Sequence, residues 1–264
     1  MSDKRIGSVF NSLLLSLSMY SIIPMPNRRF QDTNLRWALA WFPLIGAIEG
    51  GLISFWCFVA RRLGLNSFVF AALAVSIGVL LSGGIHLDGF CDSVDAIASR
   101  REREEQLQIM KDPHVGPFGV FFVSLLLISQ TAFYSQVFSL REPRFWIALG
   151  ASMVMQRALS ALLVLSLPRA RTDGLAHIFA ESAALSAKIV VFVTATLSAL
   201  VVGLIWRAAA FVVVIMIALW YIYFRFFCLR KFNGVTGDLA GMFVTVAGWI
   251  SLFGFAILAG GPMT

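Results

Sequence analysis

Three aspartates stand within eight residues of one another, and their spacing suggests metal chemistry. Asp88, Asp92 and Asp95 follow an i, i+4, i+7 pattern, which places them on one narrow stripe of a helix. Carboxylates on one stripe repel one another, so we expect positive charge among them. Hard oxygen donors suit Mg²⁺, Mn²⁺ or Ca²⁺ better than Zn²⁺, and Mg²⁺ typically adds substrate phosphates to one or two carboxylates. The pattern predicts a metal site for a phosphate-bearing substrate; the alternative is a solvated helix face.

The residues around this stripe offer further polar chemistry. His86 precedes the first aspartate, and Gly89 follows it, where a glycine allows close approach of backbone or ligand. Lys111 and Arg100, further along the same polar stretch, are candidates for holding phosphate oxygens.

A second polar stretch ends in Thr236, Gly237 and Asp238, directly before an apolar run. This pattern predicts a helix entry with a small residue near a ligand, and the free amides of a helix N-terminus bind anions. The alternative is a simple N-cap at Asp238.

Glu49 lies in the middle of an apolar run. A carboxylate inside a membrane span is a functional candidate by default. It could equally join two helices through an ion pair with Arg157 or Arg225.

The composition shows which elements position these residues. Of 264 residues, 59% are apolar and 13% are charged, against about 25% charged in soluble domains, and the mean hydropathy is +0.83. These values exclude a soluble enzyme, a disordered chain and a coiled coil, and three scattered cysteines exclude a disulfide scaffold. Long apolar runs without alternation predict helices, not barrel strands.

We therefore predict an all-α, polytopic membrane bundle that forms a single integral membrane domain over residues 1–264. It has about seven transmembrane helices plus an N-terminal interfacial or re-entrant segment at 7–25, where several serines precede two prolines. The expected spans are 39–59, 67–85, 117–139, 145–167, 188–206, 208–227 and 241–260.

Four of these spans separate the polar stretches 86–116 and 228–240, so both stretches face the same side. If 7–25 does not cross, that side carries 14 of the 21 Lys and Arg residues and the other side carries 5. The excess predicts a cytoplasmic location; if 7–25 crosses, the bias falls to 12 against 7. The net charge of +7 thus reflects membrane orientation, and we expect no nucleic-acid partner.

Taken in order, these motifs resemble the cobalamin synthase family of membrane adenosylcobinamide-GDP ribazoletransferases. The specific part is the acidic stretch together with Ile-Met-Lys-Asp at 109–112 and Gly116. Thr-Gly-Asp at 236–238, Ile-Pro-Met-Pro at 23–26 and Phe-Pro-Leu-Ile-Gly at 42–46 extend the resemblance over essentially the whole chain.

The resemblance implies a Mg²⁺-dependent reaction at a multi-pass protein of the cell inner or plasma membrane. Adenosylcobinamide-GDP and α-ribazole, or its 5′-phosphate, would give adenosylcobalamin, or its 5′-phosphate, and GMP. The oligomeric state and the lower-base specificity stay open. On this basis we expect catalytic roles for Asp92, Asp88, His86 and Asp238, substrate contacts from Lys111, Arg100, Thr236, Gly237, Asp112 and Glu49, and Mg²⁺ binding by Asp88, Asp92 and Asp95.

Two other classes compete with this interpretation. CDP-alcohol phosphotransferases also use carboxylates on a membrane helix, but their last two acids stand four apart and Ala-Arg follows Asp-Gly; here the final pair stands three apart and no Ala-Arg follows Gly89. A transporter would gather polar groups at the bilayer midplane and often shows repeated halves. This sequence instead concentrates its polar groups in two stretches on one side and shows no repeated halves.

Overall fold

The computed structural model describes residues 2–26, 32–171, 185–205 and 210–260. Within these ranges the chain is almost entirely helical, and its one β-bridge joins Arg169 to Val235. The helices are α1 (Ser2–Tyr20), α2 (Asp32–Arg62), α3 (Ser67–Leu81), α4 (Ile85–Ala98), α5 (Arg103–Ile109), α6 (Pro117–Val137), α7 (Pro143–Ser166), α9 (Leu185–Ile205), α10 (Phe211–Phe232) and α11 (Gly237–Gly260).

Six of the described helices are long and apolar enough to cross a membrane: α2, α6, α7, α9, α10 and α11. A helix pairs nearly all of its backbone groups internally, as hydrocarbon requires. The predicted all-α polytopic bundle is therefore confirmed. A seventh crossing requires α3 and α4 to be counted together as one bent pair.

The predicted span 67–85 is the one that differs from a simple crossing. Asn66 caps its start by accepting the N–H of Val69 at 2.9 Å, but α3 ends after 15 residues. Gly83 and Gly84 then adopt positive φ angles of 62° and 79°, which glycine tolerates without a steric penalty. The chain turns by 88° between the two helices, and α4 starts in a new direction.

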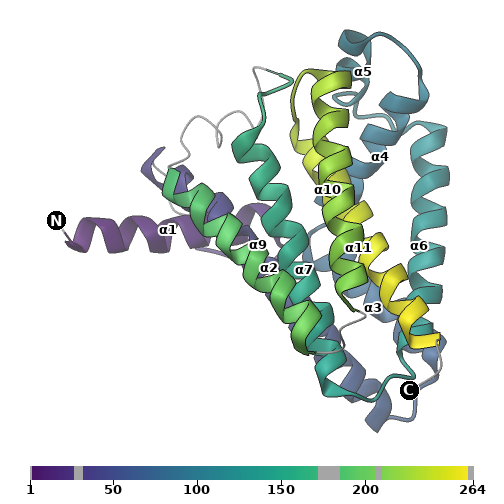
Figure 1. The fold of residues 1–264 in the computed structure, drawn as a ribbon. Coiled ribbons are helices and arrows are strands. Elements are labelled where there is room, and N and C mark those ends of the chain that lie inside the picture. Colours follow the sequence, from purple (N-terminus) through teal and green to yellow (C-terminus); the bar gives the residue numbers. More distant parts are fainter. Residues whose placement is uncertain (1, 27–31, 172–184, 206–209, 261–264) are drawn as a thin grey trace.

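Val9–Tyr20 is the described apolar part of α1, and it is shorter than a membrane-spanning helix. Its 12 residues at about 1.5 Å each fall short of a hydrocarbon core about 30 Å thick. Figure 1 shows α1 lying crosswise against the side of the bundle. This arrangement agrees with the predicted interfacial segment.

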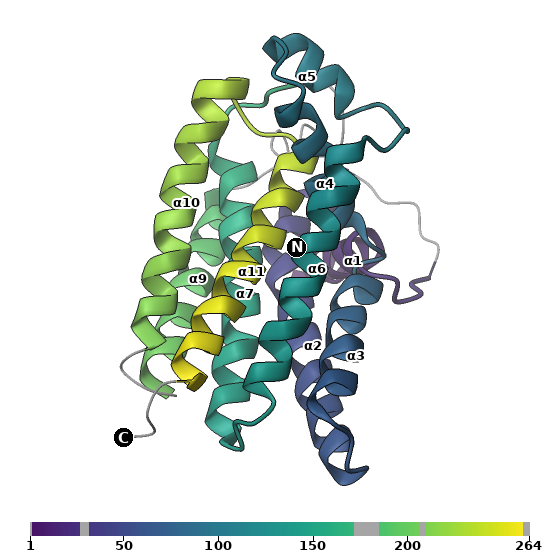
Figure 2. The ribbon, with the colours of Figure 1, turned by 90° about the vertical axis from the view of Figure 1, so that its right-hand side faces the viewer.

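Helices α7 and α11 form the centre of the bundle. α7 packs against α2, α9 and α11, while α11 also contacts α4, α6 and α10, and Figure 2 shows both between α10 and α6. Small residues permit the close α2–α7 packing: a Cβ on Gly50 would lie 2.5 Å from the Cα of Gly150, and one on Gly46 would lie 2.5 Å from the carbonyl oxygen of Met153. Such small-residue contacts are typical of membrane helix pairs.

Both polar stretches lie at the same end of the bundle. Helices α4 and α5 lie there, beside the turn that joins α10 to α11 (Figure 1). That turn forms at Asn233, which ends α10 in the left-handed conformation with φ of 54°. The even number of spans predicted this shared location.

Candidate functional site

The candidate site is built where α4 crosses the start of α11. A Cβ on Gly89 would lie 2.8 Å from the carbonyl oxygen of Asp238, and one on Gly241 would lie 3.3 Å from the backbone of His86. Only glycines permit this approach, which brings Asp238 to the acidic face of α4. The Thr245 hydroxyl donates to the carbonyl oxygen of His86 at 2.9 Å and ties the two helices together.

Asp92 lies at the centre of a cluster of negative charge. Its carboxylate is repelled by three neighbouring carboxylates, those of Asp88, Asp238 and Asp95, and it is attracted by the guanidinium of Arg171. Burial of Asp92 adds to the cost of its charge. The cluster is therefore suited to hold a cation or a cationic partner, and the metal expected from the sequence stays a prediction.

Arg171 is the functional candidate that sequence reasoning missed. Its guanidinium forms an ion pair with Asp238, and the side chain is only 15% exposed. Ala170 donates to the Val235 carbonyl oxygen at 3.1 Å, and Val235 donates to the Pro168 carbonyl oxygen at 2.9 Å. This short pairing holds the segment after α7 beside the start of α11. The sequence offers one indication of this role. The segment that follows the predicted span 145–167 lies on the same side of the membrane as the two polar stretches.

Asp95 has a different role from its two neighbours on the stripe. Its carboxylate oxygens accept the backbone N–H groups of Gly116 and Gly119, both at 2.9 Å. A Cβ at either glycine would lie within 2.4 Å of this carboxylate. Asp95 thus caps the N-terminus of α6, in place of the predicted metal contact.

Asp88 opens onto a groove between the start of α4 and α6. The groove has a volume of about 690 Å³ and apolar walls that include Leu87, Val115 and Val120. Its size lies within the range of about 300–1,000 Å³ typical of ligand sites. An exposed carboxylate beside an apolar wall suits a ligand that has both a charged and an apolar part.

The residues present fit Mg²⁺ through two carboxylates. Among the described residues, no three His, Cys, Asp or Glu side chains stand together as a metal-binding group. Asp95 is occupied with α6, and Asp238 is paired with Arg171. The carboxylates left for a metal are those of Asp88 and Asp92, and a pair of carboxylates completed by phosphate oxygens is a usual Mg²⁺ arrangement.

The predicted phosphate-binding cations lie outside this cluster of carboxylates. Arg100 follows the end of α4, and Lys111 follows α5; both are exposed. The structure brings Arg171, not these two, into the electrostatic environment of Asp92.

In the Thr-Gly-Asp motif, the threonine caps the start of α11 and the glycine is exposed. Thr236 is 3% exposed, and its hydroxyl accepts the N–H of Leu239 at 3.1 Å. The N-cap is therefore Thr236, not Asp238, and the buried Thr236 has a structural role in place of the predicted substrate contact. Gly237 is exposed, with open space around its Cβ position, which agrees with a small residue beside a ligand.

Asp112 organises the loop before α6. Its Oδ1 accepts the backbone N–H of His114 at 2.9 Å and lies 2.7 Å from the ring Nδ1 of the same residue. These contacts hold the pKa of the Asp112 carboxyl below its usual range. The side chain remains 54% exposed, so a substrate contact there is sterically open.

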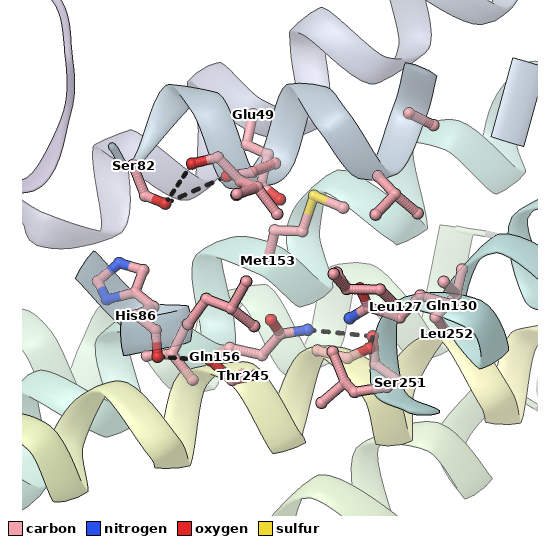
Figure 3. Close-up of a pocket in the computed structure, with 18 of the residues that line it drawn as sticks. Glu49, Ser82, His86, Leu127, Gln130, Met153, Gln156, Thr245, Ser251 and Leu252 are labelled. Carbon is pink, nitrogen blue, oxygen red and sulfur yellow. Dashed lines mark hydrogen bonds between the residues drawn. The ribbon is translucent and has the colours of Figure 1, made fainter. Parts of the chain in front are cut away.

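His86 and Glu49 belong to a separate cavity inside the bundle. This cavity of about 100 Å³ is lined by both residues together with Gln156 and Arg157, and Figure 3 shows His86 and Glu49 at its wall. The His86 Nε2 atom is buried and has no hydrogen-bond partner among the described residues. His86 thus lines the bundle interior, whereas Asp88 faces the groove, so this placement does not support His86 as the base.

Glu49 forms an ion pair with Arg157, which is 4% exposed. Of the two roles that the sequence left open, the structure supports interhelical pairing between α2 and α7. Because Glu49 also lines the internal cavity, the substrate contact expected from the sequence stays a prediction.

Comparison with known proteins adds independent information. Residues 12–256 match the cobalamin-5-phosphate synthase family. A protein of Lachnoclostridium phytofermentans named adenosylcobinamide-GDP ribazoletransferase is 35% identical over 236 residues, covering 89% of this chain and 88% of its own. Proteins with the same name from Pseudomonas savastanoi pv. phaseolicola and Clostridium botulinum are 34% and 28% identical; the alignments cover 84% and 93% of this chain and 88% and 97% of theirs.

No solved structure matches this chain. The family match spans nearly every described helix, including α4 and the start of α11. The chain belongs to the cobalamin-5-phosphate synthase family.

Proposed function

We propose that this protein is a Mg²⁺-dependent transferase of the inner or plasma membrane with its acidic end in the cytoplasm. It joins adenosylcobinamide-GDP to α-ribazole or α-ribazole 5′-phosphate and releases GMP. The observation that carries the proposal is the meeting of Asp88, Asp92, Asp238 and Arg171 at one end of the bundle, in a member of this family. The family match favours this reaction over CDP-alcohol transfer and over transport.

In this reaction a ribose hydroxyl oxygen forms a bond to the phosphorus that is joined to cobinamide. The bond from that phosphorus to the GMP phosphate oxygen breaks, and the hydroxyl proton passes to a base. Such a step needs charge neutralisation and in-line positioning above all. Bound Mg²⁺ would neutralise charge on the diphosphate oxygens.

Each side chain of the acidic cluster has a separate proposed role in this step. Asp88 and Asp92 would hold the metal, and one of these two carboxylates would accept the hydroxyl proton. Arg171 offers a planar guanidinium that suits phosphate oxygens, and its ion pair with Asp238 keeps it aimed at the cluster. The groove of about 690 Å³ beside Asp88 would receive the aromatic base of the ribazole.

An assay of the detergent-purified protein tests this proposal. GMP release and corrinoid product would be followed with each ribazole form, with Mg²⁺ and with excess chelator. We expect product only with Mg²⁺ and one of the two ribazole forms. A folded protein that forms no product with either form, but transfers from a CDP-alcohol, would refute the proposal.

A further inference from the structure

A second large groove lies between α2 and α7, near the end of the bundle opposite the acidic cluster. It has a volume of about 740 Å³, within the range of ligand sites. Its lining comes from the second half of α2, the first half of α7 and the turn that precedes α7.

The groove has a small-residue floor and an apolar rim. Gly50, Gly51 and Gly150 leave the floor without side-chain bulk, and Gly51 has open space around its Cβ position. Phe58 and Ile147, at the rim, are 56% and 52% exposed. Because α2 and α7 are spans, this opening faces the hydrocarbon region, where an apolar chain fills such a groove.

Three arginines gather at one end of the groove, and the lining contains no Asp or Glu. Arg61 donates to the carbonyl oxygens of Phe138 and Leu140, which fixes its position at the turn before α7. Arg62 lies over the Phe58 ring with its guanidinium carbon 5.2 Å from the ring centre. Arg141 is exposed at the same end.

This distribution of charge is unusual for the side on which it falls. That side holds only 5 of the 21 Lys and Arg residues, yet three of them meet at one groove. An apolar cleft with a cationic end matches a molecule with acyl chains and an anionic head group. Basic pockets between membrane helices bind anionic lipids in this way.

We propose that the groove between α2 and α7 binds an anionic phospholipid of the bilayer. The phosphate lies against Arg62 and Arg141, and an acyl chain follows the floor formed by Gly50, Gly51 and Gly150. The site is separate from the acidic cluster, so this proposal does not depend on the proposed reaction.

Native mass spectrometry of the purified chain tests the lipid site. The protein in a non-ionic detergent would be titrated with dioleoyl phosphatidylglycerol and, separately, with dioleoyl phosphatidylcholine. We expect one phosphatidylglycerol per chain bound about tenfold more tightly than phosphatidylcholine, corresponding to about 1.4 kcal/mol. Arg141→Gln should remove most of this preference.

Arg144→Gln is the matched control, because Arg144 is exposed at the same end but does not line the groove. It should keep the preference. Gly51→Leu should lose the bound lipid while all three arginines remain, because its Cβ has open space around it and the rest of the side chain would occupy the floor of the groove.

Three results would overturn the lipid site. The first is equal binding of the two lipids by the unaltered protein. The second is an equal loss of preference in the Arg141 and Arg144 variants. The third is a mass of two chains without lipid that Gly51→Leu converts to one, which would assign the groove to a second copy.

Discussion

At the scale of single residues, aspartates on one face of a helix have different roles because their neighbours differ. Asp88, Asp92 and Asp95 share one stripe of α4, and the sequence predicted that stripe from spacing alone. It could not assign Asp95, because the partner amides of Gly116 and Gly119 come from a helix whose position depends on the whole α4–α6 connection. Arg171 was missed for a similar reason, since its ion pair with Asp238 depends on backbone pairing between distant segments.

The capping role of Asp95 gives a testable consequence for stability. Asp95→Ala removes both acceptors from the N-terminus of α6, and we expect a loss of about 1–2 kcal/mol of unfolding free energy. Thermal unfolding in detergent would measure it, with Asp88→Ala as the comparison, because no hydrogen bond or ion pair among the described residues involves the Asp88 side chain. Equal stability of the two variants would contradict the capping role.

Arg171 should act on substrate binding through its guanidinium geometry. Arg171→Lys keeps the charge but loses the planar pair of donors, so we expect KM for adenosylcobinamide-GDP to rise by about tenfold or more, from a charge-assisted bond of about 1.5–3 kcal/mol. Steady-state kinetics of this variant beside Arg100→Lys would check it. A larger effect at Arg100 would return the diphosphate contact to the residue predicted from sequence.

At the scale of helices, the apolar runs predicted the positions of the membrane spans but not how the helices bend and pack. The expected spans overlap α2, α6, α7, α9, α10 and α11, with ends that differ by no more than seven residues, because hydrocarbon imposes length and composition on a crossing helix. The bend between α3 and α4 was not predicted, because it depends on the backbone conformation of Gly83 and Gly84. Glycine spacing alone does not distinguish a bend from a packing contact.

The α2–α7 contact can be tested with two adjacent glycines. Gly50→Ala places a methyl group 2.5 Å from the Cα of Gly150, whereas Gly51→Ala places one in open space. We expect Gly50→Ala to cost about 1–3 kcal/mol of stability, because the two backbones must separate, and Gly51→Ala to change it by no more than about 0.5 kcal/mol. Thermal unfolding of both proteins measures the difference. Two equally stable variants would argue against the close crossing.

At the scale of the whole molecule, the bundle brings three connecting segments to one end. The parity of the spans predicted this for the two polar stretches, whereas the contribution of residues 168–171 emerged from the fold. The same bundle holds the buried pair of Glu49 and Arg157 between α2 and α7. The sequence predicted such a pair as one of two possibilities, because a carboxylate in hydrocarbon needs a partner.

Breaking that pair should affect folding more than substrate binding. Glu49→Gln leaves Arg157 as a buried charge without its counter-ion, which typically costs about 3–5 kcal/mol. We expect a lower unfolding temperature and an unchanged KM for both substrates in the folded fraction. The double variant Glu49→Leu/Arg157→Met should recover much of the stability. A raised KM with normal stability would instead support the substrate contact expected from the sequence.

The measurement that tests the central claim most directly is turnover of Asp92→Asn. The account predicts that Asp92→Asn lowers kcat at least about 100-fold and leaves the unfolding temperature and α-ribazole binding near those of the unaltered protein. Glu104→Gln, which removes one exposed carboxylate from the neighbouring helix α5, should retain full activity. Normal turnover by a folded Asp92→Asn protein would contradict the assignment of the reaction to the acidic cluster.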